Sequence, residues 1–376
     1  MMAINRRRWF KVHGLLALPV WLLFAFVCFT GTIAVISHEL TWLTNPAARA
    51  SNPADLPVRP LHELVDAVKA EVPDAAVSNV MLMEPYLVAA VSFSSANFPV
   101  ALAYVNPYTA DVQMINDGLT FIGFMRSLHG WLLFPWYHSY SIGYYLVGAM
   151  SLVTLGALIT GAVVYKRFWR AYTRPVFRLG RGLRVALGDF HRLAGAWSLW
   201  FLLLMGLTGL WYLVQGILWH NEVEIETAVT PVPLSDVPLL SDEDSTVPRP
   251  VSLEAALAQA RHALPSIQPA WVSLPEHARD HFMIAGAGDS LFHDQYAYGA
   301  SVNQWTGEIS SLRRPETMNV LQTLTHIADP LHYGTIGGLW TKVIWFVFGL
   351  LLSTMALSGF MIWTRRTVRG VQGGAV

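Results

Sequence analysis

The stretch that decides the fold is residues 9–42, WFKVHGLLALPVWLLFAFVCFTGTIAVISHELTW. It is an apolar run of helix length, with His13 near its start and Gly31 near its end. The run recurs further along the chain, because at an offset of 178 residues His191 and Gly209 take the places of His13 and Gly31. Both runs are long enough to cross a bilayer, which needs about 20 apolar residues. Ionisable groups inside a membrane are expensive and need partners, so two histidines at matching depth predict a shared ligand.

The composition is that of an integral membrane protein. Of the 376 residues, 53% are hydrophobic and only 13% are charged, whereas soluble domains carry about a quarter charged residues. Apolar runs long enough to span a bilayer lie near residues 14–37, 142–165, 194–219 and 340–363. Substantial polar segments separate them, so we expect four spans with sizeable parts outside the membrane.

The basic residues predict the orientation of the chain. They gather before the first span, between Lys166 and Arg184, and after the fourth span, which is one side of a four-span topology. Asp189 is the only acid on that side. The positive-inside rule assigns this basic side of the membrane to the cytoplasm. The first apolar run is too long for a removable signal peptide, so we interpret it as a retained anchor.

The two segments on the other side share one plan. Each begins with a Pro-rich linker, continues with a short amphipathic helix (61–70 or 253–262) and then turns strand-like. The turn at 105–112 matches 302–309 at an offset of 197. Span two matches span four at 198, with Thr160-Gly161 on Ser358-Gly359. The chain therefore reads as two copies of one unit, span, α+β domain and span, related by a pseudo-twofold axis along the membrane normal.

These residues, together with Leu128-His129 and the run Asp329-Pro330-Leu331-His332-Tyr333-Gly334, resemble the PepSY-associated transmembrane family. The resemblance covers nearly the whole chain. It implies a bacterial inner-membrane protein linked to iron uptake, similar to haem-containing reductases that release iron from ferric siderophores in the periplasm. One departure is an insertion around residues 134–138, because 32 residues separate His129 from Gly161 and only 27 separate His332 from Gly359.

The predicted fold is an α-helical integral membrane four-helix bundle with two periplasmic α+β PepSY-like domains and an internal duplication. Both termini are predicted to be cytoplasmic. The predicted boundaries are spans at 9–38, 141–166, 190–219 and 339–364, periplasmic domains at 39–128 and 220–335, a basic cytoplasmic loop at 167–188 and a cytoplasmic tail at 365–376.

Histidines supply the candidate site residues. The single cysteine, Cys28, rules out an intramolecular disulfide or a multi-thiolate metal site. Neutral imidazoles from facing helices suit the two axial positions of a haem, so we expect two haem b groups, one on His13 with His191 and a second near the periplasmic side. A histidine bonded to a neighbouring carbonyl is the alternative for the first pair. For the second group we favour His129 with His332, and His138, His326, His38 and His220 are substitutes in that order.

The expected function is an oxidoreductase that passes electrons across the membrane to a ferric siderophore and releases Fe(II). The sequence contains no Gly-rich phosphate loop and no dinucleotide-binding fingerprint. We therefore expect the electrons to come from a separate cytoplasmic or membrane donor. Two alternatives stay open, a siderophore or iron transporter and a PepSY-type regulatory protein without redox activity. A neutral chain whose basic residues lie at a membrane face is not expected to bind nucleic acid.

Overall fold

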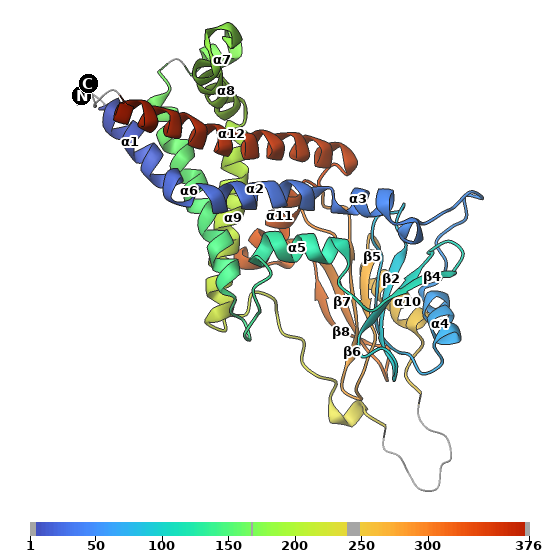
Figure 1. Cartoon of the computed structure of the whole chain (residues 1–376). Helices are drawn as coiled ribbons and strands as arrows, with labels where there is room; N and C mark the ends of the chain where they lie inside the picture. Colours follow the sequence, from blue (N-terminus) through green and yellow to red (C-terminus); the bar gives the residue numbers. More distant parts are fainter. Residues whose placement is uncertain (1–4, 167, 239–248, 373–376) are drawn as a thin grey trace, which may run out of the picture. The chain divides into compact units, whose positions relative to one another are not determined.

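The structure is a computed structural model that describes residues 5–166, 168–238 and 249–372 (Figure 1). Arg167 of the basic loop, part of the linker before residue 250 and the end of the predicted tail 365–376 lie outside the described residues. The chain forms two compact units. The helical unit comprises Met1–Ile36, Phe124–Val223 and Leu331–Val376, and the sheet unit comprises Ser37–Gly123 and Glu224–Pro330.

The helical unit contains the predicted membrane spans. Four helical stretches are long and apolar enough to cross a bilayer, namely Arg6–Val35, Ile142–Val164, Leu199–His220 and Leu339–Thr364. These four helices agree with the four apolar runs found in the sequence and are those of a multi-pass membrane protein. Their interior contains Phe24, Met150, Phe201 and Leu352, among other buried apolar side chains.

Two of the four spans are interrupted, which a single predicted helix in each place did not anticipate. The first consists of α1 (Arg6–Ala17), the 3-10 turn η1 (Leu18–Val20) and α2 (Trp21–Val35). Pro19 lies in that turn and lacks the backbone N–H that an uninterrupted helix needs. The predicted span 190–219 is divided between α8 (Leu183–Trp197) and α9 (Leu199–His220), with a break at the buried Ser198.

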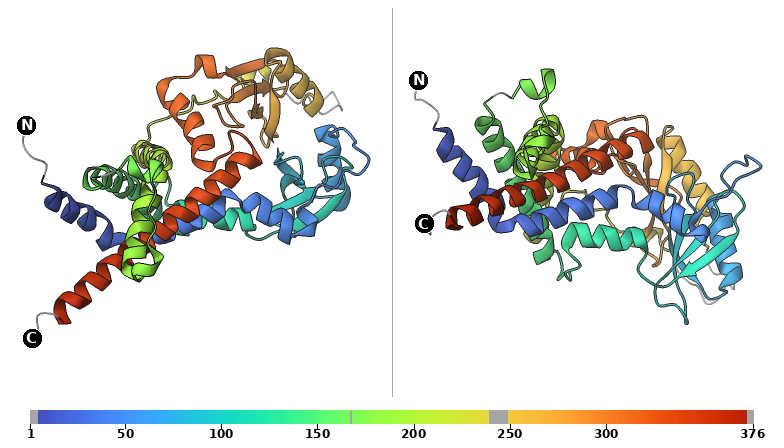
Figure 2. Two further views of the ribbon diagram at one scale, coloured as in Figure 1. Left: turned by 90° about the horizontal axis from the view of Figure 1, so that it is seen from above. Right: turned by 45° about the horizontal axis from the view of Figure 1, so that its top comes forward.

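Each interrupted helix changes its neighbour at the break. The second and fourth spans are the continuous helices α6 (Ile142–Val164) and α12 (Leu339–Gln372). Helix α1 packs against α6 while α2 packs against α12, and in the same way α8 packs against α12 while α9 packs against α6. The pairing of α6 with α9 is visible in Figures 1 and 2. The two continuous helices therefore each contact parts of both interrupted ones.

Shorter helices connect these elements. They are α3 (Ser37–Thr44), η2 (Pro46–Ala48), α4 (Leu61–Glu71), α5 (Phe121–Trp131), α7 (Arg170–Thr173), η3 (Leu179–Arg181), η4 (Leu234–Asp236), α10 (Leu253–Ala263), η5 (Pro315–Thr317) and α11 (Val320–Tyr333). Helices α5 and α11 each begin in the sheet unit and end in the helical unit, directly before spans two and four.

The sheet unit is built on one antiparallel sheet of eight strands in the order β4-β3-β2-β1-β5-β6-β7-β8. The strands are β1 (Ala76–Met81), β2 (Ala89–Ser94), β3 (Ala101–Val105), β4 (Val112–Asn116), β5 (Gln268–Ser273), β6 (His281–Ala287), β7 (Tyr298–Asn303) and β8 (Ile309–Arg313).

The two predicted α+β domains share this sheet. Strands β1–β4 form one half and β5–β8 the other, and they join where β1 pairs with β5 through Val80 and Val272. An unpaired strand edge exposes a row of backbone donors and acceptors, and this pairing removes one such edge from each half. Helices α4 and α10 complete the unit, and Leu64 and Leu257 from them lie in one apolar core with the strands.

Candidate functional site

Four histidines of the helical unit form two close pairs. His13 on α1 lies opposite His191 on α8, with ring centroids 6.2 Å apart and ring planes at 84°. His129 on α5 lies opposite His332 on α11, with centroids again 6.2 Å apart but planes at only 29°. In each pair one histidine comes from the first half of the chain and the other from the second half.

The spacing of both pairs can be compared with that of two imidazoles on one metal ion. A metal–imidazole bond is about 2.0–2.1 Å long and the ring centre lies roughly 1.2 Å behind the nitrogen, so two imidazoles on opposite sides of a metal place their centroids about 6.4 Å apart. Both observed separations, 6.2 Å, are close to this value. Each pair therefore has about the spacing of two imidazoles bound to one metal ion.

Two of these histidines are hydrogen-bonded at Nδ1 to a threonine hydroxyl. Nδ1 of His13 lies 2.8 Å from Oγ1 of Thr160 on α6. Nδ1 of His332 lies 2.8 Å from Oγ1 of Thr208 on α9. In both cases the hydroxyl comes from a neighbouring helix in the same half of the chain, so it fixes the ring from behind while the partner histidine comes from the other half.

The other two histidines have a backbone carbonyl as well as a hydroxyl at Nδ1. Nδ1 of His191 lies 3.1 Å from the Met355 carbonyl and 3.1 Å from Oγ of Ser358. Nδ1 of His129 lies 3.1 Å from the Val27 carbonyl and 3.4 Å from Oγ1 of Thr30. A carbonyl oxygen only accepts hydrogen bonds, so Nδ1 carries the proton in both rings.

The hydroxyls lead to the same tautomer for the remaining pair. Oγ1 of Thr160 donates to the Gly156 carbonyl at 2.7 Å, and Oγ1 of Thr208 donates to the Leu204 carbonyl at 2.8 Å. With its hydrogen used in this way, each hydroxyl accepts the bond from the histidine Nδ1–H. All four histidines are thus assigned the Nδ1–H tautomer, which leaves the Nε2 lone pair available for a metal.

Two of the glycines next to the hydroxyl residues, Gly31 and Gly359, make room for a histidine ring. A Cβ atom added at Gly31 would lie 2.6 Å from Cε1 of His129, and one at Gly359 would lie 3.2 Å from Cε1 of His191. At Gly161 the corresponding distance to Cε1 of His13 is 3.5 Å, which is an ordinary contact. At Thr30-Gly31 and Ser358-Gly359 the step thus combines a hydrogen-bonding hydroxyl with space for an imidazole, whereas Gly209, next to Thr208, lies against Ser151.

The two pairs lie at different depths along the first span. His13 is near the beginning of this span, whereas Thr30 and Gly31, which contact His129, are near its end. Seventeen residues separate His13 from Thr30, which corresponds to about 25 Å of helix. The pairs are therefore at opposite ends of the four-helix region.

The substitute histidines named in the sequence analysis lie elsewhere. His38 and His326 belong to the sheet unit, and His38 lies 3.7 Å from a carboxylate oxygen of Glu84. His220 ends α9 and contacts the hydroxyl of Tyr145 at 3.3 Å. His138 lies in the insertion of the first half with a φ of 55°. Within the described part of the chain, the two pairs are the places where histidines of the helical unit face one another.

His326 belongs to a charged cluster in the sheet unit. Its Nδ1 lies 2.9 Å from Asp294 and its Nε2 lies 3.2 Å from Glu226, which also pairs with Arg313 at 2.7 Å. Burial alone would lower the pKa of His326, but the hydrogen bonds that its imidazole donates to the Asp294 and Glu226 carboxylates outweigh burial and raise the pKa to about 9. A protonated imidazole has no free lone pair, so this cluster suits an ion-pair network rather than an iron ligand.

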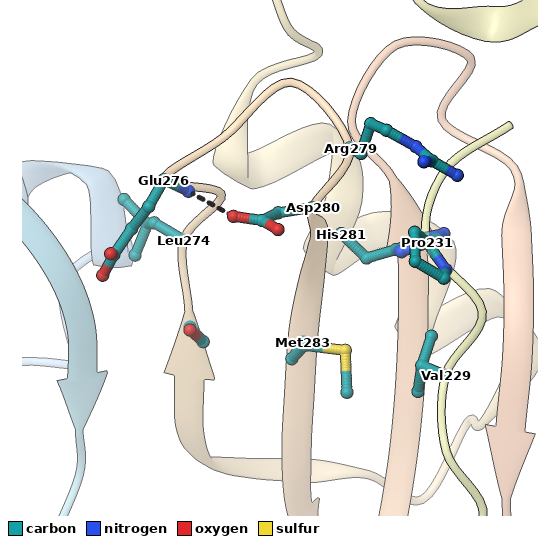
Figure 3. Close-up of a pocket in the computed structure, with 9 residues that line it drawn as sticks. Val229, Pro231, Leu274, Glu276, Arg279, Asp280, His281 and Met283 are labelled. Carbon is teal, nitrogen blue, oxygen red and sulfur yellow. Dashed lines mark hydrogen bonds between the residues drawn. The ribbon is translucent and has the colours of Figure 1, made fainter. Parts of the chain in front are cut away.

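A shallow pocket of about 260 Å³ lies in the sheet unit beside the β5–β6 hairpin (Figure 3). Arg279, His281 and Met283 line it together with the chain segment at Val229 and Pro231. The Asp280 carboxylate is engaged by the backbone N–H groups of Glu276 and His277 at 3.0 and 2.8 Å. None of the histidines predicted to hold haem lines this pocket.

Two features of the helical unit escaped the sequence analysis. The first is the role of Thr30, Thr160, Thr208 and Ser358, although their alignment between the halves was a usable signal. The second is Asp189, which is only 2% exposed and receives hydrogen bonds from Arg178 and Arg192. Asp189 is the only acid in a basic region of the sequence, and this could have predicted that it pairs with arginines.

A bare metal ion normally needs at least three protein ligands. Among the residues that the structure describes, there is no group of three or more His, Cys, Asp or Glu side chains that could hold one. A haem needs only two protein ligands because the macrocycle supplies the other four. Each histidine pair supplies two ligands, fewer than the three that a bare ion normally needs.

The comparison with protein families places the chain in one of them. The family model described as the PepSY-associated TM region matches residues 10–366. The chain belongs to the PepSY-associated transmembrane family. It is also 42% identical over 67 residues to the uncharacterized protein PA4219 of Pseudomonas aeruginosa, a match that covers 18% of this chain and 16% of that protein. The family match spans both histidine pairs and all four apolar helices.

Proposed function

We propose that this chain is an inner-membrane oxidoreductase with two haem b groups, which passes electrons across the membrane and reduces ferric siderophores in the periplasm. The observation that carries the proposal is the pair of facing histidines at each end of the four-helix region, both with centroids 6.2 Å apart. One haem would be held by His13 and His191, and the other by His129 and His332. When bound, such a group would supply one-electron redox chemistry.

The chain's own residues would prepare each site for that task. The Nδ1–H bonds to hydroxyls and carbonyls keep the imidazoles neutral at Nε2 and hold the rings in place. Two histidines at each site would favour electron transfer over the binding of an external ligand. The apolar interior around Phe24, Phe201 and Leu352 keeps water away from the region between the pairs.

Two sites at different depths suit electron transfer across a membrane. The hydrocarbon core is about 30 Å thick, and a single site in its middle would leave long distances to both surfaces. Sites separated by about 25 Å of helix bring one end of the relay toward each surface. The basic residues of the first-span entry and of the loop after α6 would make the His13–His191 end cytoplasmic.

Reduction alone is sufficient to release the metal from such a substrate. Siderophores hold Fe(III) through hard oxygen ligands, and one added electron gives Fe(II), which is larger, less charged and held more weakly by those ligands. The electron would be supplied at the site of His129 and His332 and would come ultimately from a separate cytoplasmic or membrane donor. The reaction needs no nucleophile or acid–base residue from the protein.

We also propose on which side of the membrane the sheet unit lies and how the two halves of the chain arose. The sheet unit, with its two sets of one helix and four strands, would be periplasmic and would meet the ferric chelate. The matching order of elements, the shared sequence offsets and the matching Thr-Gly and Ser-Gly steps support an internal duplication.

A transporter for a siderophore or iron is the second candidate, because predicted span one is interrupted near its middle and predicted span three near its start. Interrupted helices often form binding sites in transporters. The test is uptake of a ferric siderophore into proteoliposomes without any reductant. Uptake in a His129→Ala variant equal to that of the wild type would favour the transporter over the reductase.

The decisive experiment for the reductase starts from purified full-length protein, reduced with dithionite under anaerobic conditions and freed of excess reductant. Candidate ferric siderophores are then added while the haem α-band and an Fe(II)-specific chelator are monitored together. We expect reoxidation of the haems with one Fe(II) formed per electron. Haems that stay reduced with every ferric siderophore tried would assign a different electron acceptor to this protein.

A further inference from the structure

The four hydroxyl residues behind the histidines have a pattern that the proposed reductase function does not by itself require. Thr160 on α6 supports His13, and Ser358 on α12 supports His191. Thr30 on α2 supports His129, and Thr208 on α9 supports His332. Every candidate ligand thus has a hydroxyl at Nδ1, and each of these hydroxyl residues is at most 6% exposed.

We propose that Thr30, Thr160, Thr208 and Ser358 are positioning residues that set the tautomer and the ring plane of each histidine, and that they make the two haem sites electronically different. This inference rests on the proposed function, because it concerns how the haem ligands are tuned. The contacts that support it belong entirely to the chain and lie within the helical unit.

The tuning has a direct chemical basis. A hydrogen bond from Nδ1–H to an acceptor makes the imidazole a stronger electron donor at Nε2. A stronger donor stabilises the oxidised iron, so it lowers the reduction potential of the group it holds. Removing the acceptor oxygen should therefore raise the potential of one haem and leave the other unchanged.

Ring orientation provides the difference between the sites. The ring planes of His13 and His191 are nearly perpendicular at 84°, whereas those of His129 and His332 are nearly parallel at 29°. In a low-spin ferric haem, perpendicular axial imidazoles make two iron d orbitals nearly equal in energy, and parallel imidazoles separate them. The first arrangement gives a large-gmax electron paramagnetic resonance signal and the second gives a rhombic signal.

The ring planes follow from which helix offers the hydroxyl. His13 is bonded from the continuous helix α6, and His191 is bonded from the continuous helix α12. At the other end the hydroxyls of Thr30 and Thr208 belong to the second parts of the interrupted spans, α2 and α9. The acceptors thus approach the two pairs from different sets of helices, and the rings turn to meet them.

The test compares Thr160→Val with Thr154→Val in the full-length protein. Both threonines are buried on α6 and donate to a carbonyl of their own helix, at 2.7 and 2.9 Å, but only Thr160 contacts a histidine. Haem content, midpoint potentials and electron paramagnetic resonance spectra of the ferric protein are measured for both. A second matched comparison on α12 is Ser358→Ala against Ser353→Ala. The Ser353 hydroxyl donates to the Gly349 carbonyl of its own helix, whereas the Ser358 hydroxyl contacts His191.

For Thr160→Val and Ser358→Ala we expect a higher midpoint potential for one haem and a changed large-gmax signal, while the rhombic signal stays as in the wild type. Thr208→Val should change the rhombic signal instead, because Thr208 contacts His332. Thr160→Ser keeps a hydroxyl and should restore the wild-type values. The Thr154→Val and Ser353→Ala proteins should match the wild type.

Two results would overturn this inference. One is a Thr160→Val protein that carries both haems with unchanged potentials and unchanged spectra. The other is an equal shift in Thr154→Val, since the Thr154 hydroxyl donates to the Met150 carbonyl of its own helix. A wild-type protein that lacks haem would instead refute the proposed function itself, so the two failures are distinguishable.

Discussion

Substituting Gly31 by Ala should selectively disrupt the His129–His332 site. A Cβ atom at this position would lie 2.6, 3.0 and 3.1 Å from Cε1, Nδ1 and Nε2 of the His129 ring. Ordinary contacts between carbon atoms are about 3.5–4.0 Å, so the ring or the helix would have to move by roughly 1 Å. Movement is opposed by the hydrogen bonds of the ring to Val27 and Thr30.

The expected loss can be estimated from overpacking in protein interiors. Forcing an extra methyl group into a filled space costs about 1–3 kcal/mol. Since about 1.4 kcal/mol corresponds to a tenfold change in an equilibrium constant, haem affinity at this site should fall roughly 5- to 150-fold. The His13–His191 site lies at the other end of the span and should keep its wild-type affinity.

Gly161→Ala is the matched control. It also adds a methyl group beside a histidine in the same kind of sequence step, but its Cβ would lie 3.5 Å from Cε1 of His13 and 3.9 Å from Nδ1. Both variants are purified, stripped of loosely bound haem and titrated with haem while absorbance is followed. The reasoning is refuted by a Gly31→Ala protein that binds two haems like the wild type, or by a Gly161→Ala protein that loses a site.

Three further predictions follow from the same geometry. His13→Ala and His191→Ala should each remove one of two haems, and His129→Ala and His332→Ala should each remove the other, as measured by haem per chain; loss of both groups from any single variant would contradict independent sites. In the sheet unit, the pKa of His326 is raised from 6.5 to about 9, so its ion pairs stabilise the fold fully below pH 6.5 and lose this contribution as pH rises through 9. Relative to His326→Gln, the wild type should therefore lose up to about 3 kcal/mol of stability over that range, seen as a falling melting temperature of the full-length protein; parallel melting curves for the two proteins would contradict this. Finally, in a background with Cys28 replaced by Ser, cysteines at the exposed positions Gly180 and Ala278 should react with a membrane-impermeant reagent from opposite sides of the membrane, and labelling of both from one side would refute the proposed topology.

The sequence was informative where a repeat constrained it. Matching His13 with His191 depended on a constant offset through a whole apolar run, and the structure places these two rings together. His129 and His332 could be matched despite the insertion around 134–138, because each directly precedes a span, and their rings are also close together. The haem that we assign to each pair is a proposal that rests on this proximity.

Other parts of the structure left little trace in the sequence. The pairing of β1 with β5 joins strands almost two hundred residues apart, and the composition of either strand alone does not specify it. The first span was predicted as one helix although Pro19 was an available signal for its break, and Ser198 gave no comparable signal for the third. The exchange of helix neighbours at these breaks depends on packing across the whole unit, which periodicity along one helix does not report.

The haem content of the purified full-length protein tests the central claim most directly. Protein prepared from haem-replete cells is assayed by the pyridine haemochrome method against an independent protein concentration. The two histidine pairs predict two haem b groups per chain, each low-spin with two imidazole ligands. A colourless protein, or one haem shared between the four histidines, would contradict the account.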